Sequence, residues 1–155
     1  MTMHHPKGFT LIELIAVILL LGVLAAVAVP RFIDLKKASL QATMESMTGA
    51  MKSAATMIYA KSEVEGVADL ASSSVDIDGT SVATVYGYPS GTAAGIDKMM
   101  NAGGWQKRPS IYSGAWVYWH GVIQEDAGDA QCYLRYRQPT GPNLAPVVDV
   151  QTSGC

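Results

Sequence analysis

One long apolar segment near the N-terminus constrains this chain more than any other feature. Residues 9–29, FTLIELIAVILLLGVLAAVAV, form a continuous run in which Glu13 is the single charged residue. A helix rises about 1.5 Å per residue, so this run would be about 31 Å long and would cross a bilayer. A secretory signal peptide would instead have a shorter apolar core that ends at a small-residue cleavage site. The run therefore predicts a membrane helix rather than a cleaved secretory signal.

The position of Glu13 inside this run needs an explanation of its own. A carboxylate near the membrane interior is costly, and such a residue is by default a candidate for function with a specific partner. A plain membrane anchor accounts for the length of the run but leaves Glu13 unexplained. We therefore treat Glu13 as a candidate functional residue.

The composition of the whole chain limits what else it can be. Its 155 residues suffice for one modest domain with an accessory segment. The hydrophobic fraction is 49%, and its excess lies in the N-terminal run, so the remainder has ordinary globular composition. A formal net charge of −2 gives no reason to expect nucleic acid as a partner.

The residues around the start of the apolar run identify a candidate family. Residues 7–13, KGFTLIE, resemble the leader junction of type IV pilins and their pseudopilin relatives. The resemblance implies that a prepilin peptidase removes a leader peptide, residues 1–8, by cutting between Gly8 and Phe9. It also implies N-methylation of the new N-terminal Phe9. Gly22 and Pro30 stand where pilins commonly carry glycine and proline, and we expect both to serve assembly.

The resemblance also gives Glu13 a partner that makes physical sense. Cleavage after Gly8 would create an α-amino group on Phe9, at the edge of the apolar segment. In a homopolymer with helices side by side, Glu13 of one subunit can approach the Phe9 amine of a neighbour. Either charge buried alone would be strongly unfavourable, and pairing offsets most of that cost. We expect Glu13 to set the register between subunits.

The resemblance predicts two environments for residues 9–30. This segment would cross the inner membrane once before assembly and then lie in the core of an extracellular pilus. Partners implied by the family are the peptidase and methyltransferase, an inner-membrane assembly platform and its ATPase, and other copies of the chain. Gly22 and Pro30 weaken helical hydrogen bonding. Two readings stay open: both are tolerated in a membrane helix, or the helix kinks or melts between them on assembly.

The next segment, residues 31–62, is predicted to be an amphipathic helix that packs on a globular head. Its apolar residues recur at spacings of three and four, which marks one face of a helix. They are Leu40, Met44, Met47, Met51, Ala54 and Ile58. The methionines at 44, 47, 51 and 57 favour packing in a core over a promiscuous binding groove.

The remaining residues, 63–155, are predicted to form that head. Asp78 and Gly79 separate two β-prone segments, 75–79 and 80–88, which indicates a hairpin. The D-x-D-G pattern at 76–79 lacks the full oxygen-ligand set of a calcium loop, so we favour a turn over a calcium site. A short helix is expected at 92–101, and further strands at 110–124, 131–138 and 147–151. The fold class is α+β: a long N-terminal helix, followed by an intervening αβ-loop region, packs on a C-terminal antiparallel sheet of three or four strands, as in type IVa-like pilins.

The two cysteines, Cys132 and Cys155, are expected to pair if the head lies outside the cytoplasm. The bond would close a loop of 24 residues, from 132 to 155 inclusive, and would stabilise the fold by roughly 3 kcal/mol. A pair of free or metal-bound thiols is the alternative. In type IVa-like pilins such a disulfide bounds a C-terminal loop that contributes to subunit contacts.

A closer resemblance appears in the head. Residues 83–96, ATVYGYPSGTAAGI, look like a segment of mannose-sensitive haemagglutinin (MSHA) pilins, and Gly154-Cys155 also suits that group. This implies a major pilin for surface attachment and biofilm formation. A type II secretion pseudopilin is one alternative, although major pseudopilins generally lack the cysteine pair. A minor pilin that binds DNA or carbohydrate is another.

The sequence contains no catalytic signature. It has no nucleophile–base pattern, phosphate loop or zinc spacing, so we expect no enzyme, no cofactor and no metal. His120 is better explained as a packed or edge histidine than as a metal ligand or the base of a hydrolase. The aromatic residues around Arg135 and Arg137 are expected to pack in the sheet, with carbohydrate or DNA contact as the less favoured reading.

Overall fold

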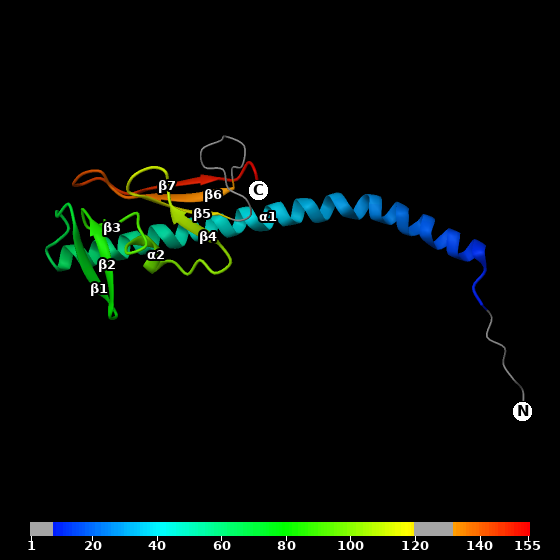
Figure 1. Ribbon diagram of the computed structural model, residues 1–155, viewed down its shortest axis with the longest axis horizontal. Helices are drawn as coiled ribbons and strands as arrows, with labels where there is room; N and C mark the ends of the chain where they lie inside the picture. The colour runs from blue at the N-terminus through cyan, green and yellow to red at the C-terminus, as the bar shows by residue number, and fades with distance from the viewer. Residues whose placement is uncertain (1–7, 120–131) are drawn as a thin grey trace, which may run out of the picture. The chain divides into compact units, whose positions relative to one another are not determined.

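A computed structural model describes residues 8–119 and 132–155 of the chain, and it contains one long helix and two antiparallel sheets (Figure 1). The predicted α+β class, with a long N-terminal helix packed on C-terminal antiparallel strands, is confirmed. The elements are α1 (Leu11–Val64), β1 (Ser73–Ile77), β2 (Thr80–Val85), β3 (Tyr88–Pro89), α2 (Ile96–Met99), β4 (Gln106–Pro109), β5 (Ala115–Trp119), β6 (Tyr133–Arg137) and β7 (Val147–Gln151). The described residues up to Ser39 form one compact unit, and Leu40–Cys155 form a second.

The first unit consists mainly of the N-terminal part of α1. Every residue from 8 to 39 whose side chain is described is exposed, including Phe9 at 87% and Leu11 at 77%. The helix contains a window with a mean hydropathy of 2.9, which is long and apolar enough to cross a membrane. Apolar surface of this extent is unfavourable in water. This part of α1 therefore requires lipid or other protein around it.

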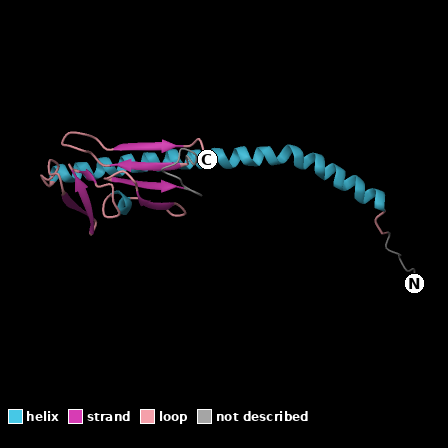
Figure 2. Ribbon diagram, turned by 45° about the horizontal axis from the view of Figure 1, so that its top comes forward, coloured by secondary structure: helices cyan, strands magenta, loops and turns pink. Residues whose placement is uncertain are grey.

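The second unit is built on the C-terminal part of α1, along which the strands lie (Figure 2). The predicted apolar stripe is confirmed in its main positions: Met44, Met51 and Ile58 have no exposed surface. Near its end the stripe shifts by one residue, because Ala55 is buried where Ala54 was expected and Ala54 is half-buried. The expectation that all four methionines pack in the core is wrong for Met57, which is 47% exposed.

The smaller sheet has the strand order β1-β2-β3. Asp78 and Gly79 both have positive φ, at 50° and 81°, as a two-residue type I′ hairpin turn requires. Asp76 Oδ1 accepts a hydrogen bond of 2.9 Å from the Gly79 backbone N–H. The D-x-D-G segment is therefore the predicted turn, and one of its carboxylates stabilises the turn itself.

The predicted strand from 80 to 88 is interrupted in the structure. Tyr86 and Gly87 adopt positive φ values of 46° and 79°, so the chain turns there and returns as β3. A side chain at Gly87 would lie 2.9 Å from the Tyr59 ring, so the close approach of helix and turn requires glycine. The Ser62 hydroxyl donates to the Gly87 carbonyl at 2.9 Å and holds the turn on α1.

The larger sheet has the strand order β4-β5-β6-β7 and is separate from the first, so the predicted antiparallel sheet of three or four strands is confirmed. The strand expected at 110–124 begins only at Ala115, because Gly114 has a φ of 68° and ends a turn. Residues 120–124 of that prediction, and His120 with them, lie outside the described residues. The sequence analysis also missed β4, an edge strand in which Pro109 is tolerated.

The core lies between α1 and the larger sheet. Trp116 and Tyr118 of β5 and Tyr136 of β6 pack against the methionines of α1. The Tyr136 hydroxyl donates to the Pro89 carbonyl at 2.8 Å, which links the two sheets. The Tyr118 hydroxyl donates to Asp97 Oδ1 at 3.0 Å. Burial raises the pKa of both tyrosines, and the Asp97 charge raises that of Tyr118 further, so both hydroxyls stay protonated as donors.

Substitution of Met51 tests the packing of α1 in the second unit. Met51→Ala removes a fully buried side chain and is expected to lower the free energy of unfolding by about 2–5 kcal/mol. Met57→Ala is the matched control on the exposed face of the same helix, and we expect a loss below about 1 kcal/mol. Denaturant unfolding of the full chain in detergent micelles measures both. Equal losses in the two variants would contradict the packing described here.

Candidate processing and assembly site

The start of α1 is closed by reciprocal hydrogen bonds between Thr10 and Glu13. The Thr10 backbone N–H and the Thr10 hydroxyl each donate to Glu13 Oε2 at 2.9 Å. The Glu13 backbone N–H in turn donates to Thr10 Oγ1 at 3.3 Å. This arrangement is a capping box, which satisfies donors that the first turn of a helix would otherwise leave unpaired.

The capping box also stabilises the negative charge of the Glu13 carboxylate. Its two side-chain bonds come from within the same chain, so the carboxylate is solvated by Thr10 before any partner arrives. Both of these donors contact Oε2. An ionised carboxylate has about four acceptor positions, so Oε1 can accept from a further donor while the cap stays in place.

The peptide between Gly8 and Phe9 lies outside the helix. Gly8, Phe9 and Thr10 have no regular secondary structure, and all three are exposed. A Cβ added at Gly8 would meet nothing within 4 Å. The fold of the described chain therefore sets no steric requirement for glycine here, and the peptide is accessible. Lys7, which completes the motif, lies outside the described residues.

Gly22 and Pro30 both fall inside α1, which is continuous from Leu11 to Val64. A Cβ at Gly22 would meet nothing within 4 Å. Glycine in a helix interior lowers helix stability by about 1 kcal/mol relative to alanine. Within a single chain, no packing contact explains why Gly22 is a glycine. The side chain of Pro30 lies outside the described residues, and proline at this position supplies no N–H to the helix.

The expected disulfide joins Cys132 and Cys155, with their Cα atoms 4.9 Å apart. Cys132 lies at the start of β6 and is buried. The Cys155 sulfur lies 3.6 Å from the sulfur of Met44, which is fully buried on α1. The bond therefore fixes the C-terminal segment against the helix as well as against the sheet, and the alternative of two separate thiols does not hold.

Reduction of this disulfide is expected to lower the free energy of unfolding by about 3 kcal/mol, because the loop of 24 residues gains freedom in the unfolded chain. Thermal unfolding of the full chain in detergent, with and without a phosphine reductant, measures the change. The double variant Cys132→Ser, Cys155→Ser is the control, since reductant should not affect it. An unchanged midpoint of the native chain on reduction would refute this prediction.

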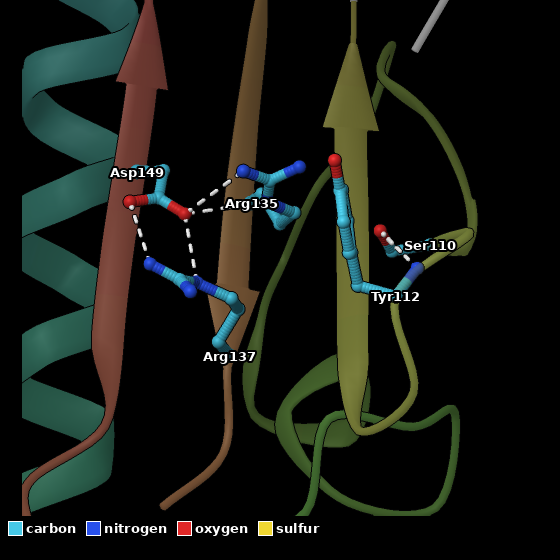
Figure 3. A network of polar contacts seen from close by, with 5 residues as sticks. All are labelled: Ser110, Tyr112, Arg135, Arg137 and Asp149. Atoms are coloured by element: carbon cyan, nitrogen blue, oxygen red, sulfur yellow. Dashed lines mark hydrogen bonds and ion pairs between the residues drawn. The ribbon is translucent and has the colours of Figure 1, made fainter. Parts of the chain in front are cut away.

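A second polar cluster lies on the larger sheet (Figure 3). Asp149 of β7 accepts from two arginines of β6: Arg135 bonds Oδ2 at 3.1 and 3.2 Å, and Arg137 forms a two-bond pair at 2.9 and 3.2 Å. The Arg135 guanidinium also lies over the ring of Tyr112, 4.6 Å from its centroid. The two guanidinium groups therefore share the Asp149 carboxylate.

The structure brings together some of the residues that the sequence singled out. Phe9 and Glu13 lie at the same helix start, and the two cysteines are bonded. The sequence analysis missed Thr10 and Asp149. A threonine three residues before a glutamate, ahead of an apolar run, is a capping-box signature and would have found Thr10. Asp149 becomes a partner of the arginines only through the register of β6 and β7.

Comparisons with known proteins agree with this N-terminal arrangement. Residues 3–29 match the family model for the prokaryotic N-terminal methylation motif. The chain is also similar to the type IV narrow pilus major component PilA5 of Thermus thermophilus, with 50% identity over 50 residues. That alignment covers 32% of this chain and 43% of the relative, so the chain spans less than half the length of the relative it matches. No solved structure matches the chain.

Proposed function

We propose that this chain is the precursor of the major structural subunit of a type IV pilus. The observation that carries the proposal is the apolar helix whose start is capped by Thr10 and Glu13, inside the matched N-terminal methylation motif. The similarity to a type IV narrow pilus major component supports it. The long helix with a disulfide-bonded α+β head is the architecture expected of such a subunit.

In this proposal a prepilin peptidase cuts the peptide between Gly8 and Phe9, and Phe9 is then N-methylated. Support comes from the exposure of this peptide, which lies outside the helix. Because no residue of the described chain requires glycine at position 8, the requirement lies in recognition by the peptidase. Residues 1–8 are the leader, and residues 9–30 are the segment that crosses the inner membrane before assembly.

The proposal gives Glu13 two successive partner sets. In the membrane the carboxylate is held by Thr10 of its own chain, which lowers the cost of its charge. In the filament it binds the Phe9 amine of a neighbouring subunit as well. A wrong stagger between subunits would leave both charges buried without their partner, so the pair sets the register. Gly22 and Pro30 contribute to assembly by weakening the helix where neighbouring helices pack.

The remaining parts follow from this role. Residues 31–62 form the part of the helix that carries the head, and residues 63–155 form the surface of an extracellular filament. The disulfide suits a small domain in an oxidising compartment, and it favours a pilin over a type II secretion pseudopilin. The finer assignment to an MSHA-like pilus for attachment and biofilm formation is supported by residues 83–96, which run from within β2 through β3 to the start of α2.

Protein sheared from the cell surface provides the test of this function. We expect one dominant species whose N-terminal residue is Phe9 and whose intact mass includes one added methyl group. A processed chain that is absent from the sheared fraction would favour the pseudopilin or a minor subunit. A chain that keeps residues 1–8 would contradict the proposal.

Substitution of Glu13 tests its role in assembly. Glu13→Gln keeps the size and the helix but removes the charge, so we expect cleavage at Gly8 to continue while the yield of sheared filaments falls more than about tenfold. Glu45→Gln is the matched control, because Glu45 is an exposed carboxylate on the same helix. Quantitative immunoblotting of sheared and cell-bound fractions measures both. Normal filament yield from Glu13→Gln would exclude the proposed pairing.

A further inference from the structure

A short charged segment of α1 follows the apolar run. Residues 31–37, RFIDLKK, contain three basic residues and one acidic residue, which leaves a formal net charge of +2. Every side chain of this segment is exposed. We propose that this segment, the basic belt, binds anionic phospholipid headgroups at the outer face of the inner membrane before assembly. The proposal rests on the proposed function, in which residues 9–30 cross that membrane.

The position of the basic belt along α1 places it at the depth of the headgroups. The apolar run 9–29 has the length of the hydrocarbon core, and α1 continues through the basic belt without a break. From Arg31 to Lys37 the helix rises by about 9 Å. The headgroup layer on each side of a bilayer is about 5–7 Å thick. Lysine side chains are long enough to return the ammonium groups of Lys36 and Lys37 to that layer.

The basic residues surround the helix instead of marking one face. Successive residues of an α-helix are rotated by about 100°, so Lys36 lies about 140° and Lys37 about 240° around the axis from Arg31. Phe32 and Ile33 fall in the gaps between them and are 71% and 64% exposed. A protein that contacts one face of the helix would leave part of this ring without a partner. A lipid layer surrounds the helix and therefore meets all of these side chains.

The positive charge of the basic belt is not neutralised within the described chain. Among residues 8–119 and 132–155, none of its four charged side chains forms an ion pair. Asp34 lies three residues from both Arg31 and Lys37, so it can pair with either. One carboxylate cannot neutralise three cations, so a positive excess remains whichever pair forms. Anionic phosphodiester headgroups supply the missing negative charge through charge-assisted bonds.

The side of the membrane on which the basic belt lies makes this binding consequential. Basic residues usually gather on the cytoplasmic side of a membrane helix, where they fix its orientation. In the proposed processed chain, which starts at Phe9, the basic belt puts three of them on the opposite side. Headgroups of the outer face offset this unfavourable bias. They also hold the apolar run at one depth until the subunit leaves the membrane.

Native mass spectrometry of the full chain in a non-ionic detergent tests the lipid preference. The probes are phosphatidylglycerol and phosphatidylcholine with identical acyl chains, offered together in equal amounts. We expect at least about tenfold more bound phosphatidylglycerol, since each basic residue near an anionic surface contributes about a fivefold preference. Glycerophosphoglycerol, the same headgroup without acyl chains, should not displace the lipid at equal concentration, because only the acylated headgroup is held beside the helix.

Charge variants locate the binding. The double variant Lys36→Gln, Lys37→Gln removes the net positive charge of the basic belt, and we expect the preference to fall at least about tenfold. Asp34→Asn changes the charge in the opposite direction, so it should raise the preference about fivefold. Lys52→Gln, Lys61→Gln is the matched control, because it removes two positive charges from the head part of the same helix. The leader is unchanged in every variant, so its own basic residue contributes equally to all.

Three outcomes would overturn the proposal: no preference for phosphatidylglycerol in the native chain, an unchanged preference in the double variant, and an equal fall in the control. Asp34→Asn without a gain in preference would overturn it as well, and this variant keeps the test decisive if loss of the lysines disturbs the fold. An unchanged lipid preference with a lower yield of sheared filaments from the double variant would assign the basic belt to contacts between copies. None of these results bears on cleavage at Gly8 or methylation of Phe9, which sheared protein tests separately.

Discussion

The rest of this molecule depends on how the Glu13 carboxylate is bonded, because Glu13 is the single charged residue in the apolar run 9–29. An uncompensated carboxylate would exclude that helix from a membrane and from a filament core. The capping box with Thr10 satisfies it within the chain and uses it to begin the helix. Since the cap occupies only Oε2, the carboxylate can accept a second partner without losing the first.

The N-terminal part of α1 presents an apolar surface for partners outside the chain, and its C-terminal part carries the head. The residue pattern along the helix accounts for this difference. Up to Ser39 its described side chains are exposed and almost entirely apolar before Arg31, so its partners must come from outside the chain. From Met44 onward one face is buried: Met47 and Met51 pack under the larger sheet, and Ile58 packs against the smaller one. The Cys155 sulfur lies against Met44. The disulfide, the Ser62 bond and the Tyr136 bond fix the head to this part of the helix and link its two sheets.

Local patterns predicted the helices and the hairpin turn, because each depends on residues close in sequence. The disulfide was predictable because the chain has only two cysteines. The predicted helical stripe was correct at Met44, Met47, Met51 and Ile58. Leu40 and Ala54 are only half-buried, and Ala55 is buried in place of Ala54. The predicted ends of strands were wrong where a residue with positive φ turns the chain, as at Tyr86 and Gly114. The sequence did not predict β4, because its charged residues and Pro109 are typical of a loop. The pairing of Arg135 and Arg137 with Asp149 depends on the register between β6 and β7, and no local pattern encodes it.

A cryo-electron microscopy structure of filaments sheared from cells tests the central claim most directly, since it shows what the Glu13 carboxylate contacts after assembly. We predict that the Glu13 side chain lies within about 3 Å of the Phe9 amine of a neighbouring subunit, as a charge-assisted hydrogen bond requires. A filament in which these two groups are more than about 6 Å apart, beyond the range of a direct ion pair, would contradict it.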